Sequence, residues 1–590
     1  MNIQNIISSG LALSMVGTLG ASAQQAATDS TMNREMVIER AYNPIVRDAE
    51  KITRMPEVET PQANKIKVKY AESQMDGSSQ TELTTLDVGS VNTSYNFDKR
   101  RGYLKIGAGN YMNIQGLAGY RFLDSDADIL GVELQHRSTN GKIRYVEEGL
   151  GKSKQRYNDD GGNVYYSHAF ESFVIRMNVA YDYSDFNYYG LIDAPSDITS
   201  AYASLTKNSQ TQRRLSANFS AITLKDAEWN YKMLFGFNGF YQTMPGIREN
   251  NVNFCMGLSK RLDSSWRFAV DVNADALFYG GESDRYEWNT GDRFSSTGVL
   301  SLLPYFDYQP SKSFSLKVGV HTDLAYGVSP YIGISPDIRM NWLMTPDWLL
   351  YADVTGGIEQ YSLNDMSRGN RYYYMDNQLK NSYTIADLRM GIRSNPVAGF
   401  WFDVYGAMGY TENALFEYSS LNALYTIAES RGYNCVKGYI ADGLHWNLGV
   451  KMKYQYSDKI DLGFSAQKNG WNMEKDQIAS YKPSFEGALD LIYRPLSSLS
   501  LDLKYAFSGG CDALLSRSYS VAGSSSMVSA EPSVMKMRDI HELSLLANWN
   551  ITSAFSIYCS ANNLLMRRQA YWYGMPEQGF HLLAGGCIRF

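Results

Sequence analysis

The chain has 590 residues, 44% of them hydrophobic and 20% charged, and its formal net charge is −6 at pH 7. This acidic balance, with no basic run to offset it, argues against nucleic acid as a partner. After the first 23 residues, no run of about 18 apolar residues is free of charges, so the sequence predicts no transmembrane helix.

The N-terminal residues have the layout of a secretory signal. The apolar stretch "IISSGLALSMVGTLGASA" ends in Ala21-Ser22-Ala23, the small-x-small pattern that signal peptidase cleaves. The preceding "MNIQN" carries no Lys or Arg, so the positive start of such a signal rests on the α-amino group alone. We expect a signal peptide at residues 1–23.

Residues 24–98 differ in composition from the rest of the chain. They combine dense mixed charge with prolines and show little alternation of polar and apolar residues, as in "STMNREMVIERAYNPIVRDAEKI". Such a composition favours a partly extended segment over a packed core. For an exported chain we expect this N-terminal segment to be periplasmic.

From about residue 99 to residue 590 the sequence alternates with period two. In residues 266–278 the even positions are apolar, whereas Arg267, Asp271 and Asp275 occupy odd positions. Period two predicts a β-strand with one apolar and one polar face. Further strands of this kind place more charged or polar side chains on the polar face: Lys317, His321, Asp323, Asp403, Asp461, Asp502 and Lys504.

The connections between these strands are of two unequal kinds that alternate along the chain. Tight turns are predicted at ten places: 124–128, 171–172, 224–228, 261–265, 310–313, 345–347, 395–399, 458–459, 495–498 and 552–554. The other connections are mostly longer, and they include 141–160, 187–210, 280–295, 359–380, 412–443 and 510–537. Short turns on one side and long loops on the other are typical of an outer-membrane barrel.

The fold class that follows is all-β: a transmembrane antiparallel β-barrel of about 22 strands (about 20–24). Ten hairpins, an opening strand near 101–111 and a closing strand near 579–590 give this number. Outer-membrane lipid contacts the apolar faces, and the charged residues line the lumen. The short turns are periplasmic and the long loops are extracellular.

The last strand adds a second signal. "GFHLLAGGCIRF" places Ile588 and Phe590 on its apolar face, and the chain ends on Phe590. A final strand with a terminal aromatic resembles the signal that the barrel assembly machinery recognises. The alternative is an ordinary last strand of a β protein.

The run "ERAYNPIVRDAEKI", followed by a large barrel, resembles the TonB-dependent receptor-type barrels of Bacteroidota. The resemblance implies a cell outer membrane location and TonB as a partner. Within it, "EMVIE" at Glu35–Glu39 is a candidate strand for pairing with TonB, although an ordinary linker is the favoured interpretation. Residues 24–98 are too few for the folded plug of that family, so we expect no full plug domain.

A barrel of this width needs something in its lumen, because an unfilled one would leak solutes. The sequence leaves three alternatives open: the 24–98 segment folded inward, the outer loops folded down, or another protein.

Few residues suggest chemistry. His321 and Asp323 share one face of a strand, as part of a hydrolytic Ser/His/Asp set would, but no G-x-S-x-G motif accompanies them and lumen lining is favoured. "NDDGGN" at 158–163 has ligands suited to calcium but lacks a distal glutamate, so an ordinary turn is favoured. Aromatic loop residues suited either to ligand stacking or to the membrane interface are Trp288, Tyr372, Tyr373 and Tyr374.

We therefore expect a channel or receptor for solute uptake, similar to a TonB-dependent receptor or a porin. The alternative is a non-transporting scaffold that anchors partner proteins in a secretion or assembly complex of the outer membrane. We expect no enzyme activity, catalytic residue, metal or other cofactor. Expected partners are outer-membrane lipid, the assembly machinery, and TonB or a periplasmic or surface protein.

Overall fold

The structure is a computed structural model. It describes residues 100–147, 151–190, 209–224, 228–243, 246–281, 294–375, 378–425, 430–474, 477–520 and 527–590. The expected signal peptide at 1–23, the segment 24–98 with Glu35–Glu39, and Trp288 lie outside these residues.

Strands account for 77% of the described residues. The strands are β1 (Gly102–Gly109), β2 (Ile114–Asp124), β3 (Asp128–Arg144), β4 (Lys152–Ala169), β5 (Phe173–Asn187), β6 (Ser209–Thr223), β7 (Trp229–Gln242), β8 (Ile247–Arg261), β9 (Trp266–Gly281), β10 (Thr297–Ser311), β11 (Phe314–Tyr326), β12 (Tyr331–Thr345), β13 (Trp348–Glu359), β14 (Ser382–Val397), β15 (Phe400–Tyr425), β16 (Ser430–Ser457), β17 (Ile460–Met473), β18 (Phe485–Leu496), β19 (Leu499–Gly509), β20 (Asp512–Ser520), β21 (Met527–Lys536), β22 (Ile540–Asn550), β23 (Phe555–Asn562) and β24 (His581–Arg589). The helical elements are η1 (Asn110–Met112) and α3 (Leu363–Gly369). Among the described residues, no helix is long and apolar enough to cross a membrane.

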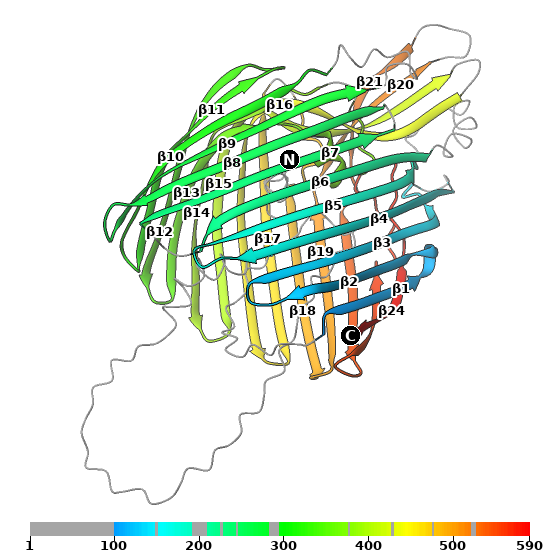
Figure 1. The fold of residues 1–590 in the computed structure, drawn as a ribbon. Helices are drawn as coiled ribbons and strands as arrows, with labels where there is room; N and C mark the ends of the chain where they lie inside the picture. The colour runs from blue at the N-terminus through cyan, green and yellow to red at the C-terminus, as the bar shows by residue number, and fades with distance from the viewer. Residues whose placement is uncertain are drawn as a thin grey trace, which may run out of the picture. The chain divides into compact units, whose positions relative to one another are not determined.

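The strands form one closed antiparallel ring (Figure 1). Strands β1 to β19 pair in chain order, β19 pairs with β22, and β24 pairs back to β1. The closure is tight, since Gly102 N donates to Phe590 O at 2.8 Å and Phe590 N donates to Gly102 O at 2.9 Å. Of the 24 strands, β20 and β21 stand outside the ring and the other 22 form it. The prediction of an all-β barrel of about 22 strands is therefore confirmed.

The ten predicted tight turns each join neighbouring strands of this ring. Its apolar face points outward: Trp229, Tyr231, Met233 and Phe235 alternate along β7, and each is 42% to 49% exposed. The same parity holds on β9, where Trp266 and Phe278 are exposed. This exposed apolar surface is what a barrel presents to lipid.

Two expected long loops are strands instead. Strands β15 and β16 continue through most of 412–443, and β20 and β21 occupy most of 510–537. Strand β20 pairs in parallel with the end of β15, at Ser419 to Ala423, and antiparallel with β21. These four strands form a sheet that continues beyond the ring, which we call the projecting sheet (Figure 1).

The segment "NDDGGN" is also part of a strand and not a turn. It lies within β4 and pairs with β3 on one side and β5 on the other. Turn-forming residues were outweighed here by the two neighbouring strands, which satisfy the backbone donors and acceptors on both edges. The first long connection is correspondingly shorter than predicted, from the end of β3 at Arg144 to the start of β4 at Lys152.

Candidate functional site: the loops that fill one end of the barrel

Two long connections fold into the barrel at the loop end. The α3 loop, residues 360–381, joins β13 to β14, and the C-terminal loop, residues 563–580, joins β23 to β24. Both contribute to one buried apolar cluster with residues from β5 and β16. Its fully or almost fully buried members include Phe186, Tyr189, Leu363, Tyr373, Val436 and Met575. Of the three sequence alternatives for filling the lumen, folded loops are what the described residues show at this end.

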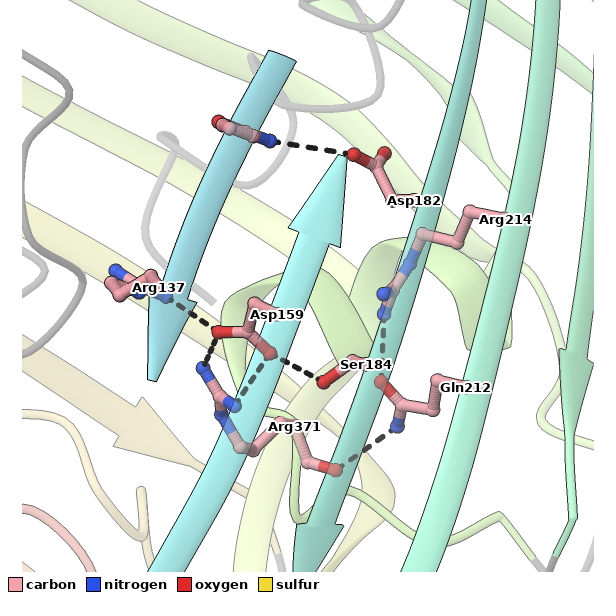
Figure 2. Close-up of polar contacts among 8 residues, drawn as sticks. Arg137, Asp159, Asp182, Ser184, Gln212, Arg214 and Arg371 are labelled. Atoms are coloured by element: carbon pink, nitrogen blue, oxygen red, sulfur yellow. Dashed lines mark hydrogen bonds and ion pairs between the residues drawn. The ribbon is translucent and has the colours of Figure 1, made fainter. Parts of the chain in front are cut away.

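The contact that spans the interior most clearly is an ion pair between β4 and the α3 loop. Arg371 Nη1 donates to Asp159 Oδ1 at 2.9 Å and Arg371 Nη2 donates to Asp159 Oδ2 at 2.8 Å. Asp159 also accepts hydrogen bonds from Arg137 Nη2 at 3.1 Å and from Ser184 Oγ at 2.6 Å (Figure 2). A carboxylate that accepts two parallel guanidinium contacts is held in one orientation.

Arg371 is enclosed on its other sides. Its guanidinium lies 4.1 Å from the centre of the Tyr157 ring, and its carbonyl oxygen accepts Gln212 Nε2 at 3.1 Å. Burial alone lowers the pKa of the guanidinium, but the charge and hydrogen bonds of Asp159 outweigh it and raise the pKa above its ordinary value. Arg371 therefore stays charged, and removing it would leave Asp159 with only Arg137 and Ser184.

A second anchor holds the start of helix α3. Glu249 on β8 is 1% exposed, and its carboxylate accepts Ser362 Oγ at 2.7 Å, Leu363 N at 2.7 Å and Asn364 N at 3.1 Å. Amides at a helix start have no partner within the helix, and a carboxylate there meets both their hydrogen bonds and the helix dipole. Glu249 thus fixes the helix against the wall.

Arg214 on β6 adds a third anchor. Its Nε donates to Asn364 Oδ1 at 3.0 Å and its Nη2 donates to Ser367 Oγ at 2.8 Å. Figure 2 shows Gln212 between the two arginines: its Oε1 accepts Arg214 Nη2 and its Nε2 donates to Arg371 O. Strands β4, β6 and β8 therefore hold a loop that begins and ends on β13 and β14.

His321 and Asp323 fix the backbone where the α3 loop leaves the sheet. His321 Nδ1 lies 2.8 Å from Gly356 O, and Asp323 Oδ2 accepts Ile358 N at 2.8 Å. His321 Nε2 is 3.1 Å from Asp323 Oδ1, an ion-pair distance without hydrogen-bond geometry. Gly357 between them has φ 142°, and a Cβ there would lie 2.7 Å from His321 Nδ1. Both ring nitrogens of His321 face oxygen acceptors, so His321 and Asp323 serve to hold the strand bulge at Gly357.

The structure places the other predicted lumen residues on the face opposite the exposed apolar side chains, spread over five strands and not gathered in one site. Most meet a partner one or two strands away: Asp271 with Lys232 at 2.8 Å, Asp275 with Asn251 at 3.0 Å, Lys317 with Asp337 at 2.5 Å, Asp403 with Tyr351 at 2.9 Å, and Asp461 with Arg494 at 2.6 Å. Asp502 accepts Ser500 Oγ at 2.6 Å, while Arg267 and Lys504 stand opposite Asp307 and Asp490 in register. Their lumen-lining role stays a prediction.

The predicted loop aromatics have a structural place. Tyr372 and Tyr373 are 6% and 1% exposed, and the Tyr372 ring meets Phe186 and Tyr189 edge to face. Tyr374 packs against the same cluster. In this conformation all three tyrosines contact the buried cluster, and ligand stacking stays a prediction. Among the described residues, no group of His, Cys, Asp and Glu side chains is placed to hold a metal ion.

At the C-terminus, Phe590 and Ile588 are 60% and 49% exposed on the outer face. Their recognition during assembly also stays a prediction.

Sequence reasoning missed the anchors of the α3 loop. Asp159 lies in "NDDGGN", noted for its calcium-type ligands, and Arg371 lies in "RGNRYYYMDNQ", noted for its tyrosines. Nothing local joins two segments 212 positions apart. Glu249 and Arg214 gave no signal beyond a charge on the polar face of a strand.

No protein-family model matches the chain, and no curated protein matches it in sequence. The structure is similar to the FrpB iron transporter from Neisseria meningitidis, with a TM-score of 0.61, 13% identity, and coverage of 84% of this chain and 82% of that one. It is also similar to the ferric enterobactin receptor PfeA from Pseudomonas aeruginosa, with a TM-score of 0.58, and to the siderophore receptor PirA from Acinetobacter baumannii, with a TM-score of 0.57. Each of these two is 10% identical in sequence, and each comparison covers 83% of this chain and 80% of the other. What these likenesses show is the fold, a closed antiparallel barrel of 22 strands.

Proposed function

We propose that this chain is an outer-membrane receptor-like channel for solute uptake, closed at its loop end by the α3 loop. One observation carries the proposal: an inward-folded loop is held across the interior of a 22-stranded ring by charged side chains. These polar contacts and the apolar packing of residues such as Leu363 and Tyr373 hold the loop in place, and loops of this kind open and close over interior sites.

The proposal includes the rest of the expected setting. The barrel lies in the Gram-negative outer membrane, with its tight turns and N-terminal segment on the periplasmic side. Siderophore, iron and copper receptors and transporters share the fold, which supports a small solute as cargo. TonB is the partner that such barrels suggest, and Glu35–Glu39 is the segment proposed to meet it.

Liposome swelling tests the proposal. Liposomes that contain the purified chain are diluted into isotonic sugars of increasing size, and swelling reports entry. We expect little swelling for the wild-type chain and size-limited swelling for Arg371→Ala combined with Glu249→Ala. The matched control is Arg339→Ala combined with Glu133→Ala, because Arg339 contacts Asp353 and Glu133 contacts Tyr103, both within the ring. Swelling that is equally absent from every variant would contradict a channel.

A scaffold for partner proteins is the second candidate, and the projecting sheet favours it. Strands β15 and β16 have 26 and 28 residues, far more than about 9–11 needed to cross the membrane. Together with β20 and β21 they carry a four-stranded surface beyond the ring. Pull-down in mild detergent compares the wild-type chain with a chain that lacks residues 512–536. A partner that binds the wild-type chain but not the shortened chain, while both barrels stay sealed, supports the scaffold.

A further inference from the structure

The outer face of β6, β7 and β8 carries a pocket of about 560 Å³ near the loop end of the barrel. Its lining residues are Thr211, Arg213, Tyr241, Thr243 and Arg248. Arg213 stands opposite Tyr241 in register, and Tyr241 stands opposite Arg248, so the three side chains form a row across neighbouring strands.

The pocket faces outward and not into the lumen. On β6 the exposed Leu215 shares the parity of Thr211 and Arg213, and on β7 the exposed Phe235 shares the parity of Tyr241. The alternate residues Gln212, Gln242 and Glu249 are at most 1% exposed and hold the α3 loop inside. The same strand ends therefore present the pocket on one face and the α3 loop on the other.

The position along the strands matches the membrane boundary. From Arg213, β6 continues to its turn-side end at Thr223. That length is close to the roughly 9–11 residues of a tilted strand that crosses the hydrocarbon core. Arg213 therefore lies at the level of the lipid headgroups, where an arginine on the lipid-facing side is tolerated at little cost. Leu215 and Tyr181, which pair in register and are 44% and 47% exposed, offer an apolar surface directly below it.

The lining of the pocket contains two arginines and no acidic residue. On the neighbouring strands, Arg156 pairs with Asp185 at 2.5 Å and His136 pairs with Asp160 at 2.7 Å. Asp185, which stands opposite Thr211, is thus already held by an arginine. No ion pair joins Arg213 to any residue that the structure describes. The Arg248 guanidinium lies 5.6 Å from the centre of the Tyr241 ring.

We propose that this pocket binds the phosphate group of an anionic lipid in the outer leaflet of the membrane. Two guanidinium groups present planar pairs of donors that match phosphate oxygens, and the threonine and tyrosine hydroxyls add further donors. The acyl chains lie along Leu215 and Tyr181. The site is independent of what the barrel transports, because it lies on the outside of the wall.

Native mass spectrometry of the full chain, released from detergent, tests this site. The probes are lipid A with one phosphate monoester, the same lipid after phosphatase treatment, and inorganic phosphate. We expect one retained lipid A per chain. Arg213→Gln combined with Arg248→Gln reduces the bound fraction at least about tenfold, because two charge-assisted contacts are lost. The dephosphorylated lipid shows a similar loss.

Arg339→Gln is the control, since this arginine lies on β12, away from β6, β7 and β8, and is paired with Asp353. We expect it to bind lipid A as the wild-type chain does. Arg213→Lys combined with Arg248→Lys keeps the charge without the planar donor pairs and gives intermediate binding. Heat-dependent migration in electrophoresis verifies that each variant is folded.

Three results overturn the proposal. The double glutamine variant binds lipid A as well as the wild-type chain does, the wild-type chain retains the dephosphorylated lipid equally well, or inorganic phosphate displaces the lipid at equal concentration. The last would identify a site for free phosphate. The second uses only wild-type protein, so it decides the matter even if a variant does not fold.

Discussion

Asp159 on β4 and Arg371 in the α3 loop lie 212 positions apart in the chain and meet through two parallel contacts of 2.9 and 2.8 Å. Their ion pair is partly buried, with side chains 24% and 17% exposed. Removing one partner of such a pair leaves a charge in a poorly solvated place, at a cost of about 2 kcal/mol once partial exposure is allowed for. This pair, with Glu249 and Arg214, holds the α3 loop inside the barrel.

Glu249→Ala should loosen the start of helix α3. The substitution removes the acceptor for two backbone amides and the Ser362 hydroxyl, at a cost of about 1–3 kcal/mol. We expect hydrogen exchange at Leu363 and Asn364 to accelerate at least about tenfold. Glu249→Gln, which keeps one acceptor oxygen, should fall between. Unchanged exchange at both amides would show that the loop does not depend on this carboxylate.

The C-terminal loop should respond to pH through Glu577. Burial raises the pKa of this carboxyl to about 8, the charge of Glu542 adds to the rise, and Arg371 opposes it. Between the ordinary pKa of a glutamate and about pH 8, the packed loop binds a proton that a detached loop would release. Packing is therefore fully favoured at low pH and is lost as pH rises through about 8.

Hydrogen exchange of residues 563–580 between pH 5 and pH 9, corrected for the intrinsic exchange rate, measures this response. We expect protection to decrease with rising pH in the wild-type chain and to be nearly flat in Glu577→Gln. Equal slopes in the two chains would assign the pH response to another group.

The architecture could be predicted because period two is local information. The spacing of Trp266 and Phe278 predicts an outward apolar face, and the ten tight turns then give the number of hairpins. Closure follows, since a sheet with one lipid face cannot leave unpaired edges in hydrocarbon. Each step uses residues close together in the chain.

The loop end could not be predicted in this way. "NDDGGN" has the composition of a turn but lies in β4, because pairing with β3 and β5 outweighs local preference. Strands β15 and β16 likewise continue through an expected loop. The α3 loop depends on side chains from β4, β6 and β8, and only the closed ring brings these opposite β13 and β14. The sequence shows His321 and Asp323 as a pair on one strand face, but it does not show that they contact the bulge at Gly357.

The outward apolar face makes a prediction about depth in the membrane. Val320 lies near the middle of β11 and is 44% exposed, whereas Val397 lies at the turn end of β14 and is 64% exposed. An arginine on the lipid face costs about 2–4 kcal/mol at the midplane and about 0–1 near the interface. We expect Val320→Arg to lower the free energy of unfolding in lipid vesicles by the larger amount and Val397→Arg by the smaller. Equal effects would place the two positions at equal depth.

The C-terminal residue should matter for assembly. Both contacts between Phe590 and Gly102 join backbone atoms, so exchanging Phe590 for serine or tyrosine tests the aromatic ring. We expect Phe590→Ser to reduce the amount of folded barrel in the outer membrane several-fold, and Phe590→Tyr to retain it. Heat-dependent migration of membrane fractions gives the folded amount. If the serine variant assembled as well as the tyrosine variant, the ring would have no part in recognition.

Single-channel conductance in a planar lipid bilayer tests most directly whether the α3 loop closes the barrel. We compare the wild-type chain, Arg371→Ala, Asp159→Asn and the ring control Arg339→Ala. Closure by the loop predicts rare openings in the wild-type chain and the control, and frequent, larger openings in both variants of the Asp159–Arg371 pair. A wild-type chain that conducts steadily, with the same conductance in all four, would show that this loop does not close the channel.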